Sequence, residues 1–396
     1  MERADPPVSS DLLLPGAPGR LRIRVATDAD QAALQRFNAR LREGGVQYQL
    51  PLAFRLPGEF RQATDGLPTY REMLIAEDGA EIRAGLLLYR GGLWEARQER
   101  PFCWVQLPVS EGLVDSRHSM AFVMLMRAVI TREPRPMSLG IGSLDEAYAR
   151  LLDRLGWRHA RVPFVFHPVR AREVLRRLPV LQGRRWVRAA ARAMGLLSLD
   201  RAVGALLELA RHRRRHLLRE CAVQSEPRFG GWADEVYRTA RGDYGAAVAR
   251  DAASLNVRYP PEDPRYIRLR VRRKSTGEEL GWIVVIHGQL QRSRYFGDLH
   301  VGTLVDGFGR RSDVARLVLA GANYLADARV DLIVANWSHA AWLSAAKRCG
   351  FLSGPSNYFL FVSPKDSSVL EPSCPLSEVH MTRGDNDGPG HLLPVG

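Results

Sequence analysis

The sequence predicts an α/β (α+β) protein with two similar domains in tandem, each a mixed, mostly antiparallel sheet flanked by helices. The main observation is an internal repeat. The pattern that follows Leu113 returns after Leu304: a turn, a helix, a short apolar strand, a second helix that ends in Gly-Trp or Gly-Phe, and an aromatic strand. A shared order of elements indicates duplication more strongly than the Leu-Val-Asp that begins both copies, and duplication decides the architecture.

A predicted hairpin precedes each copy of this pattern. Two apolar runs flank Asp78-Gly79 in the N-terminal half, and two more flank Thr276-Gly277 in the C-terminal half. Asp-Gly between extended runs is a strong signal for a β-hairpin, and Ser-Thr-Gly is a weaker one. A hairpin followed by strand, helix and strand predicts a mixed sheet with a crossover helix on its face.

Each half also has an opening segment. In the N-terminal half, LRIRV predicts a strand, Thr-Asp a helix cap, and the spacing of Leu34, Phe37 and Leu41 a helix with one apolar face. In the C-terminal half, ECAVQSEPRF predicts the strand, and helices are expected near residues 232–241 and 246–255. LNVRYP then leads into the second hairpin.

These patterns divide the 396 residues into five segments. The two tails have no periodicity and many breakers, which predicts mobility. The expected segments are a flexible tail (1–20), an N-terminal domain (21–170), a linker (171–219), a C-terminal domain (220–363) and a disordered C-terminal tail (364–396).

The positive charge is concentrated in and around the linker. Residues 170–219 hold fourteen arginines, no lysine and three acids, which gives +11 of the net charge of +14. Trp186, Ala189 and Ala193 follow helical spacing, with arginines on another face. The pattern predicts a basic amphipathic helix.

Two interpretations of this helix stay open. In one, its apolar stripe packs on the flanking domains and its arginines are solvated. In the other, Arg170–Arg219 docks on an anionic membrane surface or an acidic protein. Specific nucleic-acid binding is not expected, because the sequence has neither aromatic-and-basic interleaving on a strand nor a recognition-helix motif.

The cysteines and the apolar runs indicate the compartment. Cys103, Cys221, Cys349 and Cys374 lie far apart, without a C-x-x-C pair or a His at ligand spacing. Buried free thiols are expected rather than disulfides or a metal site. No signal peptide is recognisable, and no apolar stretch approaches the roughly 20 residues that span a bilayer. A cytoplasmic protein is expected, with peripheral membrane attachment left open.

The predicted order of elements resembles the GNAT superfamily of acyl-CoA N-acyltransferases. RVATDADQAAL resembles the opening strand and helix of that family, and DRLGW and KRCGF resemble the end of its last helix. The resemblance covers residues 21–170 and 220–363. It implies that acetyl-CoA or another acyl-CoA, or an acyl carrier protein, donates an acyl group to an amine of a small molecule or peptide, without a metal. An acidic carrier protein would also give the linker arginines a partner.

The resemblance further implies a loop of backbone N–H groups that opens a helix and cradles the diphosphate of the donor. The family has R/Q-x-x-G-x-G/A at this place. The donor-binding residues implied here are Leu304, Val305, Gly307, Phe308, Gly309, Arg310, Arg311 and Ser312. Leu304 replaces the family's Gln or Arg, and Asp306 adds a negative charge near the phosphate position. The N-terminal copy, DSRHS, has no glycine, so its site is expected to be degraded.

Catalysis by this family needs a base for the amine and often a Tyr as proton donor, four residues before the Gly-aromatic pair. Leu152 and Ala346 stand at that position, so the usual donor is missing from both copies. The expected base is either Asp298 or His300, which flank the strand that leads into Gly-Phe-Gly, or Glu111 in the N-terminal copy.

Two further residues are expected to contact the substrate, Tyr358 on the last strand and Arg258 in LNVRYP. Tyr148 and Trp342, one helical turn before the position of the missing Tyr, are expected to be core aromatics.

Three functions stay open. The first is an N-acyltransferase that uses the C-terminal copy. The second is a non-catalytic adaptor or membrane-recruited scaffold built from two GNAT folds without active sites. The missing glycines of the N-terminal copy and the missing Tyr of both copies favour it. The third is a Fem-type aminoacyl transferase, which pairs two such domains with a basic helical insert and uses charged tRNA. Fold resemblance alone does not separate them.

Overall fold

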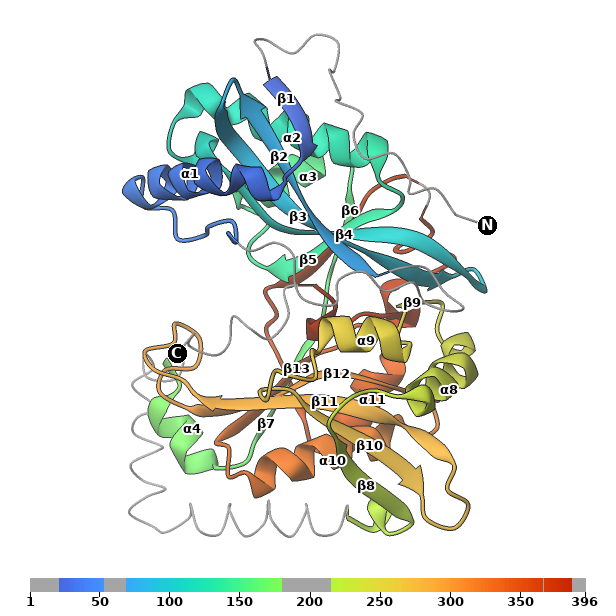
Figure 1. The fold of residues 1–396 in the computed structure, drawn as a ribbon. Helices are drawn as coiled ribbons and strands as arrows, with labels where there is room; N and C mark the ends of the chain where they lie inside the picture. Colours follow the sequence, from blue (N-terminus) through green and yellow to red (C-terminus); the bar gives the residue numbers. More distant parts are fainter. Residues whose placement is uncertain (1–20, 53–68, 180–214, 366, 387–396) are drawn as a thin grey trace. The chain divides into compact units, whose positions relative to one another are not determined.

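The computed structural model describes residues 21–52, 69–179, 215–365 and 367–386 (Figure 1). The chain forms two compact units. Unit 1 comprises Met1–Leu93, Glu99–Ala160 and Phe359–Ser368, and unit 2 comprises Trp94–Gln98, Arg161–Tyr358 and Val369–Gly396. The predicted N-terminal tail and most of the predicted linker helix lie outside the described residues.

Unit 1 is a mixed sheet with helices on both faces. Its strands run in the order β1-β2-β3-β4-β5-β15-β6. The strands are β1 (Leu21–Val25), β2 (Tyr70–Asp78), β3 (Glu81–Glu95), β4 (Gln98–Ser110), β5 (Pro136–Ile141), β6 (Arg158–Arg161) and β15 (Tyr358–Val362). The helices are α1 (Gln31–Glu43), α2 (Ser119–Arg132) and α3 (Ala147–Arg154), with the 3-10 turns η1 (Asp28–Asp30), η2 (Glu111–Leu113) and η3 (Ser116–His118).

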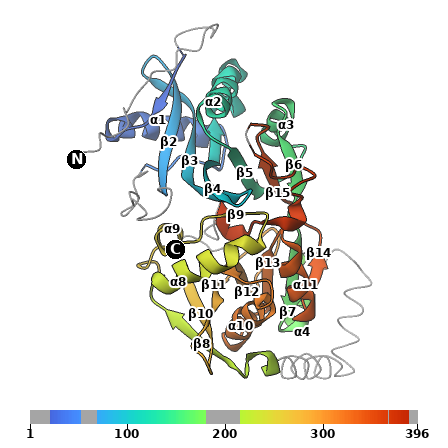
Figure 2. The ribbon, with the colours of Figure 1, turned by 90° about the vertical axis from the view of Figure 1, so that its right-hand side faces the viewer.

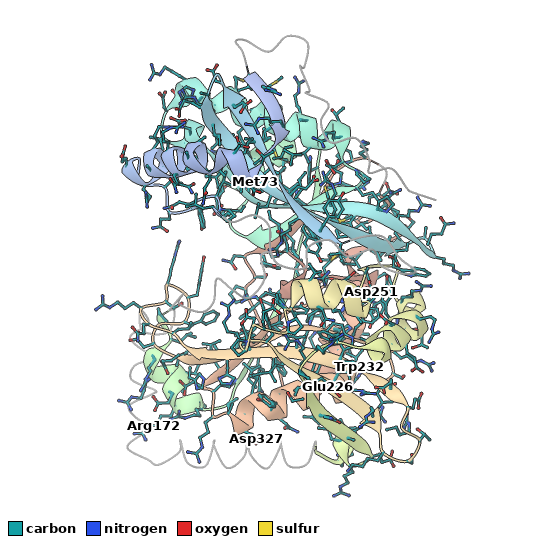
Figure 3. All side chains as sticks on the ribbon, viewed as in Figure 1. Met73, Arg172, Glu226, Trp232, Asp251 and Asp327 are labelled. Carbon is teal, nitrogen blue, oxygen red and sulfur yellow. The ribbon has the colours of Figure 1, made fainter. Side chains whose placement is uncertain are left out.

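Alternate residues of β2 face the two layers of unit 1. Met73 and Ile75 pack in one core with α1, and Figure 3 labels Met73 beside that helix. Leu74 and Ala76 pack in a second core with α2. This alternation is the period of two that a strand imposes on its side chains.

Unit 2 has the same architecture. Its strands run in the order β14-β7-β13-β12-β11-β10-β8. They are β7 (Phe164–Pro168), β8 (Cys221–Glu226), β10 (Ile267–Arg273), β11 (Glu279–Gln289), β12 (His300–Gly309), β13 (Leu332–Asn336) and β14 (Leu352–Gly354), and a short parallel pair joins β9 (Ala246–Val248) to β16 (Val379–His380). The helices are α4 (Ala171–Arg177), α8 (Gly231–Ala240), α9 (Ala252–Arg258), α10 (Val314–Asp327) and α11 (Ala340–Arg348), with η4 (Arg215–Leu218), η5 (Arg241–Asp243), η6 (Leu376–Glu378) and η7 (Arg383–Asp385).

Helices cover both faces of the unit 2 sheet: α10 lies on one face, and α8 and α9 lie on the other (Figure 1). The paired residues Trp282 and Phe308 contact the aromatic residues of the α8 side, Phe229 and Tyr237. Gly321 of α10 lies against Leu304, Ile283 and Val285 on the other side. Asp306, two residues before Phe308, therefore faces α8 and α9.

The closing aromatic strands are exchanged between the two halves of the chain. β15, from the C-terminal half, lies between β5 and β6 (Figure 2), and β7, from the N-terminal half, lies between β13 and β14. Each copy was expected to close with its own aromatic strand. FVFHP and YFLFV have the same extended, apolar character, so either fits the vacant place beside a central strand. Strand propensity predicts a strand but does not select its partner.

Several sequence predictions are confirmed. Both hairpins form, β2 with β3 and β10 with β11, and Gly79 and Gly277 adopt the positive φ that these turns need. The predicted apolar face of α1 is fully buried. The four cysteines are buried and free, and Trp342 is a core residue, while Tyr148 is partly buried against the core.

Three predictions are wrong in detail. Residues 246–255 form a strand and then the start of α9, not one helix. Thr27 caps a 3-10 turn that precedes α1 rather than α1 itself. The stretch from Ser367 to Asn386, expected as part of a disordered tail, is ordered, and His380 and Thr382 are fully buried. Its breakers build tight turns that hold polar side chains against the core, which periodicity does not detect.

Candidate functional site

The two central parallel strands of unit 2 separate along their length. β12 pairs with β13 at three positions, from Val301 with Leu332 to Thr303 with Val334. Beyond Thr303, β12 continues to Gly309 paired only with β11 among the described residues. Diverging parallel strands leave main-chain donors and acceptors on their facing edges without strand partners, and these groups must bond to something else.

The C-terminal segment, defined here as Val379–Asp385, fills this divergence. It contacts β12, because His380 Nε2 lies 2.8 Å from Gly307 O. It also contacts the residues that follow β13: the Met381 N–H donates to Ser338 Oγ over 2.7 Å, and the Ser338 N–H donates to Met381 O over 3.1 Å. A bridge pairs Thr382 with Trp337. The chain itself therefore bonds to one main-chain acceptor of β12 and to the two residues that follow β13.

A buried charge cluster holds the segment in place. It consists of Arg250, Arg258, Asp306 and Asp385, with the Tyr259 hydroxyl. Arg250 Nη2 lies 3.1 Å from Asp306 Oδ1 and 2.8 Å from Asp385 Oδ2. Arg258 Nη1 lies 3.1 Å from Asp385 Oδ1, and Tyr259 OH donates to Asp306 Oδ2 over 2.9 Å. Because none of the four charged side chains is more than 8% exposed, each depends on the others.

Helix α9 positions both arginines. Asp251 caps this helix by accepting from the Ser254 N–H over 2.9 Å, and Figure 3 labels it at the start of α9. Arg250 stands directly before the cap, and Arg258 is the last residue of the helix. The cap therefore fixes the spacing of the two guanidinium groups over Asp306.

Burial sets the protonation states at this site. It raises the pKa of Tyr259 and of Asp385 above their usual values. Burial opposes the charge of Arg250, but the two carboxylates hold its pKa above its usual range. Burial lowers the pKa of His380 well below its usual value, and that of His339 to about 4. Both histidines are therefore neutral at pH 7.

The structure places the predicted donor-binding glycines in a strand rather than in a loop. Gly307 and Gly309 belong to β12 and pair with Ile283 and Gly281 of β11. A Cβ at Gly309 would lie 2.5 Å from Leu280 O, and a Cβ at Gly307 would lie 2.6 Å from the Trp342 ring. Close packing, not ligand approach, accounts for these two glycines.

Most of the other residues predicted to contact the donor are buried in the core or bonded to other residues of the chain. Leu304, Val305 and Phe308 are fully buried in the core. The turn into α10 begins at Arg310, which is exposed. Arg311 bonds Asp243 through its N–H and pairs with Glu378 over 2.7 Å, and Ser312 donates to Asp313 over 3.0 Å. Carboxylates already occupy the place expected for phosphate at Arg311.

Asp298 and His300 do not join this site. They stand at the beginning of β12, and Gly309 stands at its end, about 30 Å away at the rise of an extended strand. Asp298 Oδ1 accepts from the Arg292 N–H over 2.7 Å, so it shapes a turn. His300 Nε2 lies 3.1 Å from Nδ1 of His287. The spacing in sequence could not show that the strand would separate them so far.

The two predicted substrate contacts do lie beside the C-terminal segment. Arg258 belongs to the buried charge cluster. Tyr358 is 2% exposed, and the guanidinium of Arg383 lies over its ring, 5.9 Å from the centroid. Both residues contact the chain's own C-terminal segment.

Sequence reasoning missed Arg250, Thr382, Arg383 and Asp385. One signal was available: Thr382-Arg-Gly-Asp385 has the spacing of a capping box, and the structure forms that box around η7. A capping box inside a supposed tail predicts a local turn. Nothing in the sequence connects that turn to Asp306.

Unit 1 has a corresponding divergence. β4 pairs with β5 at Cys103 with Pro136 and at Trp104 with Met137. Beyond these two pairs, Ser138 Oγ donates to Val105 O over 3.3 Å. β4 then bends at Leu107, which has a φ of +46°, and runs on to the turn before α2.

The charged residues near that turn differ in burial and in the partners they bond. Glu111 is buried and accepts from Arg40 over 2.9 Å and from Arg83 over 2.9 Å. Burial opposes its charge, but the two arginines hold its pKa below the usual value. Glu111 is therefore a poor base at neutral pH. Arg117 has a side chain that is 85% exposed and pairs only locally, with Asp115.

Among the described residues, no group of three or more His, Cys, Asp or Glu side chains could hold a metal ion. No helix within the described ranges is long and apolar enough to cross a membrane.

Comparison with solved structures identifies the fold. N-myristoyltransferase from Saccharomyces cerevisiae, solved with bound myristoyl-CoA and inhibitors, is similar over 96% of this chain and 91% of its own, with a TM-score of 0.52 and 11% identity. A GCN5-related N-acetyltransferase from Anabaena variabilis is similar over 86% of this chain and 72% of its own, with a TM-score of 0.51 and 11% identity. The fold is the GNAT fold. No family model and no curated protein matches the sequence.

At this level of identity the likeness extends to the fold alone. In unit 2 the C-terminal segment lies beside the diverging strands β12 and β13.

Proposed function

We propose that the chain is an N-acyltransferase that takes an acyl group from acyl-CoA bound by unit 1 and transfers it to an amine. The observation that supports this proposal is the divergence of β4 and β5 in a GNAT fold whose second divergence is filled by the chain itself. The proposal moves the donor from the C-terminal copy, where the sequence predicted it, to the N-terminal copy.

The diverging strands suit a thioester donor. Main-chain groups on facing strand edges can bond the amide groups of a pantetheine arm, as they would bond an added strand. In the reaction the amine nitrogen forms a bond to the thioester carbonyl carbon, the carbon–sulfur bond breaks, and the amine proton passes to the thiolate. The proposal assigns the base to no described residue of unit 1, because Arg40 and Arg83 lower the pKa of Glu111 and so weaken it as a proton acceptor.

The turn that opens α2 supports a place for the diphosphate. Arg117 is exposed, and its pairing with Asp115 is the kind of surface ion pair that contributes little to stability. A phosphate at the start of α2 can replace that partner and meets the positive end of the helix. Arg311, at the equivalent turn of unit 2, is tied to Asp243 and Glu378.

Paired charge reversals test the proposal. Arg117→Glu and Arg310→Glu change exposed arginines at equivalent turns, so both variants should fold. We expect Arg117→Glu to weaken binding of acetyl-CoA and myristoyl-CoA by about tenfold or more, since it replaces a charge-assisted contact by repulsion. Arg310→Glu should bind like the unchanged protein. Titration calorimetry measures both, and the opposite ranking would return the donor to unit 2.

The filled divergence of unit 2 favours one second candidate, a non-catalytic scaffold with two GNAT folds. This candidate predicts that neither acyl-CoA nor free CoA binds to the unchanged protein. Recruitment by an acyl carrier protein or an anionic membrane through Arg170–Arg219 remains a proposal with either function. Flotation with anionic vesicles at low and high salt tests the membrane, because electrostatic attachment must weaken as salt rises.

A further inference from the structure

Arg383 carries a buried positive charge that no carboxylate among the described residues of unit 2 balances. Its side chain is 7% exposed. Nε and Nη2 both donate to the same oxygen, Asn336 Oδ1, over 3.1 and 2.8 Å, while Nη1 is buried without a hydrogen-bond partner. The remaining neighbour is the face of Tyr358. An amide oxygen and a ring are neutral partners for a full charge.

The charges around Arg383 do not sum to zero. Arg250 and Arg258 share the two carboxylates of Asp306 and Asp385. Arg383 adds a third guanidinium to the C-terminal segment without a third carboxylate. Counted over the described residues, the buried region around the segment therefore carries one excess positive charge, and burial lowers the pKa of Arg383.

Another buried arginine of the same unit, Arg268, has more partners inside the chain. Arg268 is 4% exposed, its Nε has no hydrogen-bond partner, and Asp263 and Glu262 favour its charge from a distance. However, its guanidinium donates to three main-chain oxygens, those of Tyr259, Pro260 and Tyr266. Arg383 has one side-chain oxygen in place of three main-chain oxygens, so its outer nitrogen Nη1 is left for an acceptor that the described residues do not supply.

We propose that unit 2 binds the carboxylate group of a small ligand at Arg383, at the end of β13. One monoanion neutralises the single excess charge, and a carboxylate fits the fork of Nη1 and Nη2. A phosphate dianion would leave the region negative and would need more donors than one guanidinium offers. This site does not depend on acyl transfer by unit 1.

The first test compares stabilities without ligand. Arg383→Met removes an uncompensated charge and keeps the side-chain volume, so the melting temperature should stay the same or rise. Arg250→Met is the matched variant: it strips a shared partner from Asp306 and Asp385, and its melting temperature should fall by several degrees. An equal fall in both variants would show that the chain itself pairs Arg383, and this would overturn the proposal.

The second test uses ligands. N-acetylglycine carries a carboxylate, and N-acetylglycinamide is its neutral counterpart. We expect N-acetylglycine to raise the melting temperature of the unchanged protein by about 2 °C or more at saturation, and N-acetylglycinamide to leave it unchanged. Arg268→Met should keep the response and Arg383→Met should lose it. A response that survives in Arg383→Met, or one given by inorganic phosphate and not by N-acetylglycine, contradicts a carboxylate site.

Discussion

The glycine and aspartate residues of β12 show that one sequence pattern can either form a ligand-binding loop or allow close packing in the core. Asp-Gly-Phe-Gly before a helix is compatible with a phosphate loop. In this chain Asp306 is fully buried between two arginines, and both glycines lie where another strand, or the ring of Trp342, comes within van der Waals distance. Both explanations require small residues at the same positions, so the pattern alone does not distinguish them.

Gly309 should therefore be required for folding. In Gly309→Ala the new Cβ would meet the main-chain oxygen of Leu280 at 2.5 Å, and a strand pair cannot give way as a flexible side chain can. We expect a loss of about 3 kcal/mol in the free energy of unfolding. Gly231→Ala, where no atom lies within 4 Å of the new Cβ, is the control and should change stability by less than about 0.5 kcal/mol.

Chemical denaturation of both variants provides the measurement. If Gly309→Ala is as stable as Gly231→Ala, then β12 opens at this point in solution, and the predicted loop would return as a candidate.

At the scale of elements, the sequence predicted correctly those helices and hairpins that depend on nearby residues alone. The apolar face of α1 and both hairpins follow from residue spacing and turn type. The boundary between β9 and α9 was missed, because AAVARDAASL has alanine on both sides of Arg250 and Asp251, and Asp251 was not recognised as a cap. The segment around Thr382 was missed because its stability comes from contacts with residues far away in sequence.

Hydrogen exchange distinguishes an ordered C-terminal segment from a disordered tail. The Met381 and Thr382 N–H groups donate to Ser338 Oγ and to Asp385 Oδ2, each over 2.7 Å, inside the core. We expect them to exchange at least about a thousandfold more slowly than the amide of Thr276, which lies in the exposed β10–β11 turn.

The prediction is specific to residues 379–385. Exchange of these amides at the rate of Thr276 would mean that the segment leaves the divergence freely, and a donor could then enter unit 2.

At the scale of the whole molecule, the exchanged strands connect the folding of the two halves. The N-terminal half of the chain supplies β7 to unit 2, where Val165 is 1% exposed, and the C-terminal half supplies β15 to unit 1. The internal repeat predicted two sheets of like order. It did not predict the exchange, because copies that resemble each other provide interchangeable closing strands.

Cleavage between the halves tests this arrangement. A protease site placed within residues 180–214 would separate β7 from the rest of unit 2 in sequence. However, β7 pairs with β13 at five positions and with β14 at three, and these pairs must break before a fragment can leave. We therefore expect the two fragments to elute together in size-exclusion chromatography and to separate only in denaturant. Val165→Asp should weaken this association, because it buries a charge in the core of unit 2. Fragments that separate and remain folded would mean that each half closes its own sheet.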